Sequence, residues 1–174
     1  DKRIPLSFGA AFSAYAQVVT TRATIGYTLA LSFTFGSLFS FLTSSQQVFA
    51  EVFALGDWFP LAFASIAVTL SAAQFSNSRL VMRMGMRRLC HGALIGFDAL
   101  SALHAGIAHL THESLTVFLL LLLPTMFLFG FMGANFNAIA MEPMGHIAGA
   151  ASAFMGFIST VGGSFLGQVM TTQP

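Results

Sequence analysis

Charged residues are scarce in this sequence. Asp, Glu, Lys and Arg make up 7% of its 174 residues, against about 25% in an ordinary soluble domain. Seven basic and six acidic residues leave a formal net charge of +1, so there is no basic field to neutralise the phosphates of a nucleic acid. The composition therefore argues against a water-soluble domain, and we expect no nucleic-acid partner.

Cysteine is almost absent as well. The single cysteine, Cys90, cannot form a disulfide within the chain, and one thiol cannot make a zinc site without several other ligands. Neither kind of cross-link is expected to stabilise the fold. Burial in lipid is the remaining source of stability.

Motifs of enzyme active sites are missing too. Residues 109–113 read His-Leu-Thr-His-Glu, which is not the His-Glu-x-x-His order that puts two zinc ligands on one helix face. The sequence has no Gly-x-Ser-x-Gly elbow and no phosphate-cradling loop. We predict that the chain is not an enzyme and takes no metal or cofactor, and we interpret residues 109–113 as a solvated loop.

Long apolar runs are the main feature that is present. About 20 apolar residues in a helix cross the hydrocarbon core of a bilayer. We predict an all-α integral membrane protein, a polytopic helical bundle, preceded by a linker at residues 1–22 and followed by a truncated end at 171–174. Its five transmembrane helices are expected at residues 23–42, 58–77, 90–110, 115–140 and 147–170.

The positive charges indicate an orientation. Lys and Arg accumulate in cytoplasmic loops, and all seven fall before the first span or between the second and third spans. We therefore place these two regions in the cytoplasm and the 109–113 loop outside. The seven cations are Lys2, Arg3, Arg22, Arg79, Arg83, Arg87 and Arg88, and the groups expected outside are Glu51, Asp57, His109, His112 and Glu113.

The linker has an apolar stripe. Phe8, Phe12, Tyr15 and Val19 recur at helical spacing after a possible cap at Ser7, which predicts an amphipathic helix along the cytoplasmic membrane surface. A disordered linker is the alternative.

Two segments carry a family resemblance. Residues 78–89 form a basic stretch around Gly85, and residues 135–143 with 145–153 combine Asn, Glu-Pro and Gly-Ala-Ala patterns. They resemble the turn between the second and third helices of each half, and the signature of the tenth and eleventh helices, in the Bcr/CflA-type multidrug efflux group of the major facilitator superfamily. The chain looks like the C-terminal half of such a transporter, with its spans standing for helices seven to eleven.

The resemblance implies a secondary active transporter. It implies export of apolar or amphipathic small molecules against inward proton flow, by alternating access, in a bacterial inner membrane. The N-terminal half of the same transporter, the lipid bilayer, substrates and protons would be its partners. The alternative is a small, non-transporting polytopic membrane protein that acts as an assembly subunit, and an intramembrane enzyme ranks third.

The basic turn and the last span supply candidates for gating and packing. Arg79 and Arg83 around Gly85 are topology anchors in the simpler interpretation; in the functional one, Arg83 reaches a carboxylate or helix end when the cytoplasmic side is closed. Small residues on the last span allow another helix to approach closely, either for static packing or for sliding. This expected face consists of Gly149, Ser152, Gly156, Thr160, Gly163 and Gly167.

Cavity and proton candidates lie in the other spans. Phe33, Ser37 and Phe41 share a face of the first span, which the resemblance puts at the central cavity. Asn135 either lines that cavity or hydrogen-bonds between helices. Asp98 lies near the centre of the third span, where a charge is costly; it either handles protons or stays protonated and hydrogen-bonds locally.

Overall fold

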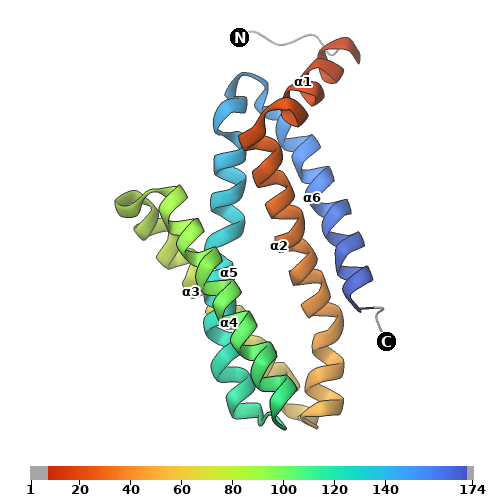
Figure 1. The fold of residues 1–174 in the computed structure, drawn as a ribbon, viewed down its shortest axis with the longest axis vertical. Helices are drawn as coiled ribbons and strands as arrows, with labels where there is room; N and C mark the ends of the chain where they lie inside the picture. Colours follow the sequence, from red (N-terminus) through yellow and green to blue (C-terminus); the bar gives the residue numbers. More distant parts are fainter. Residues whose placement is uncertain (1–7, 172–174) are drawn as a thin grey trace. The chain divides into compact units, whose positions relative to one another are not determined.

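The computed structural model describes residues 8–171, and side chains from Phe12 to Val169. This part of the chain consists of helices and short connections, without strands, which confirms the all-α prediction. Lys2, Arg3, Ser7 and residues 172–174 lie outside the described residues. The main helices are α1 (Phe8–Thr20), α2 (Arg22–Gln47), α3 (Phe59–Met84), α4 (Met86–Leu110), α5 (Leu115–Met141) and α6 (Ala148–Thr171) (Figure 1).

Short helical turns connect some of them. A π-helical turn, η1 (Val48–Val52), follows α2, and a 3-10 turn, η2 (Gly56–Trp58), precedes α3. A second 3-10 turn, η3 (Glu142–Ile147), joins α5 to α6.

Within residues 8–171, four helical stretches are long and apolar enough to cross a membrane: Arg22–Val52, Gly56–Met84, Met86–Leu110 and Leu115–Val169. The last one, 55 residues long, contains α5 and nearly all of α6. These two helices have 27 and 24 residues, and each alone exceeds the roughly 20 residues of one crossing. Five crossings, with α5 and α6 counted separately, stay a prediction.

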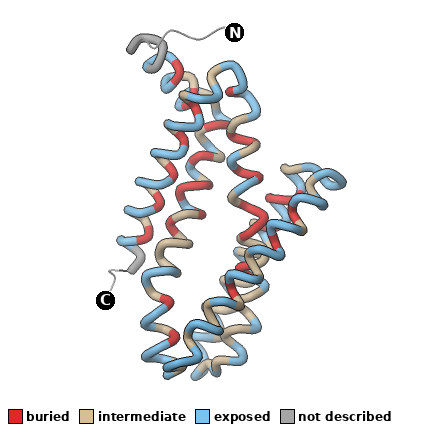
Figure 2. Tube along the Cα trace, turned by 180° about the vertical axis from the view of Figure 1, so that it is seen from behind, coloured by how far each residue is buried: buried red, intermediate tan, exposed pale blue. Residues whose placement is uncertain are grey.

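The chain forms two compact units. Unit 1 comprises the chain up to Ser40 and from Phe136 onward, and unit 2 runs from Phe41 to Asn135. Figure 2 marks the buried positions in both units, and they recur at helical intervals along the elements.

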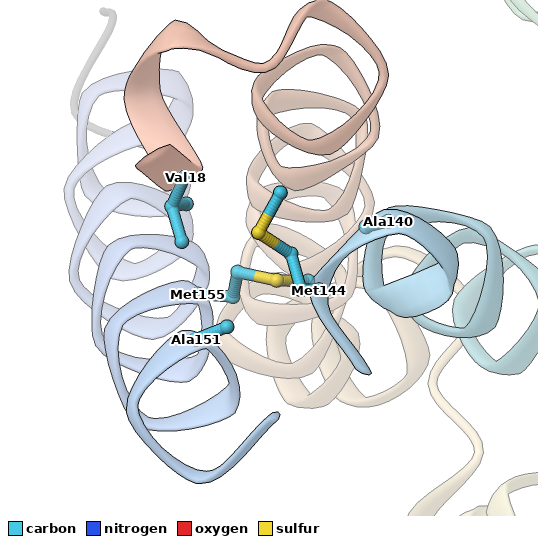
Figure 3. Close-up of a cluster of buried hydrophobic side chains, with 5 residues drawn as sticks. All are labelled: Val18, Ala140, Met144, Ala151 and Met155. Carbon is cyan, nitrogen blue, oxygen red and sulfur yellow. The ribbon is translucent and has the colours of Figure 1, made fainter. Parts of the chain in front are cut away.

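Unit 1 has a core at the turn between α5 and α6. Val18 from α1 packs with Ala140, Met144, Ala151 and Met155 (Figure 3), all at most 2% exposed. Unbranched methionine side chains fill irregular gaps between helices that cross at different angles. The chain therefore reverses at η3 around a sulfur-rich cluster that also holds α1.

The face of α1 that packs on this core is not the apolar stripe seen in the sequence. Ala14 and Val18 are buried, whereas Phe12 and Val19 are 76% and 51% exposed. At the edge of the contact the ring of Tyr15 stacks on Phe154, with 4.7 Å between centroids. The helix expected in the linker is present, and Phe12 and Val19 of its apolar stripe do not pack on this core.

Unit 2 is built on aromatic packing at the start of α5. Phe49 of η1 is fully buried and packs with Ile66, Leu122 and Met126. The ring of Phe118 meets Phe49 edge-on at 5.6 Å. This cluster fixes the connection between α2 and α3 against α5.

Candidate functional site

Helices α2 and α6 of unit 1 make a close contact through glycines. A Cβ atom added at Gly163 would lie 2.6 Å from Cβ of Phe35 and 3.1 Å from the backbone nitrogen of Gly36. A Cβ at Gly167 would lie 3.1 Å from the carbonyl oxygen of Gly36. The two backbones approach this closely only because these positions lack side chains.

Between this contact and the N-terminus of α2, the buried face of the helix carries hydroxyl side chains. Thr24, Thr28 and Ser32 are buried one turn apart. The hydroxyl of Thr28 donates to the Thr24 carbonyl at 2.7 Å, and that of Ser32 to the Thr28 carbonyl at 3.1 Å. The Ser32 hydroxyl also lies 3.4 Å from the carbonyl oxygen of Ile158 on α6. The interface is therefore lined by small and hydroxyl-bearing residues rather than by interlocking apolar side chains.

The packing face expected on α6 needs correction. Gly163 and Gly167 are buried against α2, but Gly149, Ser152 and Gly156 are exposed. No atom lies within 4 Å of a Cβ built on Gly149 or Gly156. The buried residues follow a four-residue ridge instead, because helices that cross at an angle interdigitate along such ridges. The ridge consists of Ala151, Met155, Ser159, Gly163 and Gly167.

In unit 2, α3 and α5 cross at a point with two close contacts. A Cβ at Gly130 would lie 2.5 Å from Cβ of Ala73. One turn further, the Nδ2 group of Asn135 donates to Oδ1 of Asn77 at 2.7 Å and to the carbonyl oxygen of Phe131 at 2.7 Å. Asn135 and Asn77 are 3% and 7% exposed.

This geometry corrects the cavity role expected for Asn135. Its side chain hydrogen-bonds between α3 and α5 of unit 2, which is the alternative interpretation of the sequence. Asn77 is the partner, and the sequence analysis missed it. Asn77 stands at the end of a long apolar run, where an amide group needs a hydrogen-bond partner because water is scarce. This position is the sequence signal that could have identified it.

The basic segment between α3 and α4 is helical except at one residue. Helix α3 continues to Met84 and α4 begins at Met86, while Gly85 between them has φ +79° and ψ 149°. An L-residue rarely adopts this conformation. Gly85 thus provides the tight reversal expected from the sequence. Arg83 is exposed, and the guanidinium of Arg79 lies 4.2 Å from the centre of the Phe75 ring.

The expected aromatic strip on α2 divides between the two units. Phe33 belongs to unit 1 and is 56% exposed, and Ser37 donates to the Phe33 carbonyl at 3.1 Å. Phe41 is partly buried against the Phe49 cluster of unit 2. Phe33 is exposed and Ser37 is half-buried, whereas Phe41 contributes to packing.

Asp98 is exposed on α4. The neighbouring Gly96 lies on the packed side of this helix, where an added Cβ would come within 2.8 Å of Cδ1 of Leu128 on α5. Asp98 is therefore not enclosed between helices of unit 2.

Similar proteins are known for nearly the whole chain. An uncharacterized MFS-type transporter of Bacillus subtilis is 26% identical over 171 residues, which cover 95% of this chain and 41% of that protein. A bicyclomycin resistance protein homolog of Haemophilus influenzae is 27% identical over 176 residues, which cover 99% of this chain and 43% of that protein. The chain thus spans about two fifths of the length of the curated relatives it matches. No family model and no solved structure matches it.

These two similarities confirm the resemblance carried by the sequence motifs. Both relatives are named for transport or resistance and neither for an enzyme activity, in line with the prediction that the chain is not an enzyme. Together with the long apolar helices, they support a multi-pass membrane protein.

Proposed function

We propose that the full-length protein containing this chain is a secondary active transporter that exports apolar or amphipathic small molecules by proton antiport. The chain supplies helices of its C-terminal half, and an N-terminal half completes the carrier in a bacterial inner membrane. The names of the two relatives, a transporter and a resistance protein, support the general class.

The glycine contact between α2 and α6 is the observation that carries the proposed mechanism. Gly36, Gly163 and Gly167 bring the two backbones together without large side chains between them. A helix can slide or rock along such a smooth surface at low energetic cost, and alternating access requires movements of this kind. The α2–α6 contact is the proposed sliding surface.

The crossing of α3 and α5, unlike the α2–α6 contact, is expected to resist sliding. The hydrogen bond between the side chains of Asn135 and Asn77 is directional and would break if the two helices slid along each other. We assign this crossing to holding α3 and α5 together during transport.

Substrate contact is proposed for the exposed side of α2. Phe33 and Ser37 place an aromatic ring beside a hydroxyl, and polyspecific pockets combine aromatic walls with a few polar groups. An aromatic face also attracts a cationic ligand by about 0.5 to 2 kcal/mol, depending on desolvation. At the cytoplasmic turn, Arg83 is the proposed gating residue that engages the other half of the carrier.

Export can be measured in bacteria that lack their own drug pumps. Cells expressing the full-length protein should retain less of a lipophilic cationic dye than cells with an empty vector, and a protonophore should abolish the difference. Phe33→Ala should change resistance unequally among drugs, whereas Leu29→Ala, which alters an exposed apolar side chain one turn away, is the control. Equal dye retention with and without the protein would contradict efflux, and export that survives the protonophore would contradict proton antiport.

A further inference from the structure

The pair formed by His104 and Glu113 is a polar site that the proposed transport function does not use. His104 lies in the last third of α4, and Glu113 lies in the connection to α5. Nε2 of His104 is 3.2 Å from each of the two carboxylate oxygens of Glu113. The side chains are only 18% and 9% exposed, so the two groups meet in a mostly enclosed place.

The carboxylate of Glu113 is incompletely satisfied. Its Oε1 atom is buried and has no hydrogen-bond partner, because the hydrogen bond from His104 goes to Oε2. A buried carboxylate beside a neutral imidazole would leave an uncompensated negative charge, which is costly away from water. One proton shared by the pair removes that charge, either as an ion pair with His104 protonated or as a neutral carboxylic acid.

The surrounding elements hold the two groups in place. Ser114, directly after Glu113, caps α5, with its Oγ atom 3.4 Å from the backbone nitrogen of Val117. The ring of His104 stands edge-on to Phe118, with 5.2 Å between centroids. Farther along α4, Cys90 is buried, whereas Arg87, Arg88, His91 and Asp98 are exposed. The titratable side chains nearest to the pair along the chain and on the turns η1 and η2 are exposed. They are His109, His112, Glu51 and Asp57.

We propose that His104 and Glu113 form a proton-binding site that takes up one proton from the water at this end of unit 2. Ring contacts connect this site to η1. Phe118, which contacts His104, also packs on Phe53, 4.9 Å away, and on Phe49 of η1. We therefore expect a change in the charge of the pair to be felt at the π-helical turn that follows α2.

The site's place in transport rests on the proposed function. The segregation of Lys and Arg puts the connection between α4 and α5 outside, which is the side where protons enter an antiporter. Proton binding by the pair itself requires only the geometry of unit 2.

A double-mutant cycle on thermal unfolding tests proton binding directly. Tm is measured for the full-length protein in detergent with His104→Gln, Glu113→Gln and both changes, over a range of pH. An ion pair couples the two changes most strongly at a pH where the carboxylate is ionised and the imidazole is protonated. There we expect a non-additive Tm shift of about 2 to 4 °C, falling on both sides. His109→Gln with Glu113→Gln is the matched control and should be additive.

Two outcomes of this cycle would refute the proposed proton-binding site. Additive shifts at every pH would show that the residues do not share a proton, and a coupling that stays constant toward alkaline pH would indicate a plain hydrogen bond from neutral His104. Where Glu113→Gln does not fold, Glu113→Asp keeps the charge and shortens the side chain, and the cycle with His104→Gln is run on it. A coupling that does not peak in the same pH range then rejects the site equally.

Export from proteoliposomes at varied outer pH tests the role in transport. His104→Gln should bring the ratio of rates at acid and alkaline outer pH several-fold closer to one, while His109→Gln should leave that ratio unchanged. A wild-type carrier without pH dependence would refute proton antiport but leave the unfolding cycle intact. A pH-dependent wild type with an unaffected His104→Gln variant would refute the assigned role alone.

Discussion

Alanine at Gly163 should destabilise the protein, and alanine at Gly156 on the same helix should not. At Gly163 the added Cβ would lie 2.6 Å from Cβ of Phe35, where two carbons prefer about 3.5 to 4.0 Å. Its next neighbours are backbone atoms of Gly36 and Ser32, both at 3.1 Å. Neither a rigid Cβ nor a backbone can rotate away, so α2 and α6 must separate by about 1 Å to restore contact distance.

The size of the effect follows from comparing the two positions. Overpacking costs about 1 to 3 kcal/mol, while replacing glycine by alanine inside a helix gains up to about 1 kcal/mol. The gain applies to both variants and cancels in their difference, because a Cβ at Gly156 meets no atom within 4 Å. Gly163→Ala should therefore be less stable than Gly156→Ala by about 1 to 3 kcal/mol.

Thermal unfolding of the full-length protein in detergent, followed by circular dichroism, measures this difference. About 1 kcal/mol corresponds to a Tm change of about 2 to 4 °C in a unit of 150–250 residues. Equal Tm values for the two variants would refute the close approach of α2 and α6. A loss confined to Gly156→Ala would indicate that another helix packs at Gly156 instead.

Three further predictions concern the crossing, the turn and the orientation. Asn135→Ala should cost up to about 2 kcal/mol by leaving buried Asn77 unpaired, and adding Asn77→Ala should cost little more; additive unfolding free energies would show that the two side chains are not coupled. Gly85→Ala should cost about 1 to 3 kcal/mol, because φ +79° and ψ 149° suit glycine almost exclusively; an unchanged Tm would contradict that conformation. In intact cells, a membrane-impermeant thiol reagent should label a cysteine at Gln47 and spare one at Met86; the reverse pattern would invert the orientation.

The membrane-spanning helices could be predicted because hydrophobic length is a local property. Each run of about 20 apolar residues must pair its backbone groups internally in lipid and so forms a helix. The reversal at Gly85 was equally readable, since glycine next to a basic stretch ends one helix and starts the next. The helices nevertheless extend beyond the apolar runs, because arginine and methionine are good helix formers. Only Gly85 interrupts the segment expected as a turn.

Contacts between helices were decided by the tertiary structure. In water the apolar face of a helix identifies its buried side, but in lipid every face is apolar and small residues indicate only where close approach is allowed. Gly156 and Gly163 therefore look equivalent in the sequence, and the crossing of α2 with α6 selects Gly163. The polar pairs were also decided by the tertiary structure. The sequence shows that Asn135 and Glu113 each need a polar partner, but only the packing of the helices makes Asn77 and His104 those partners.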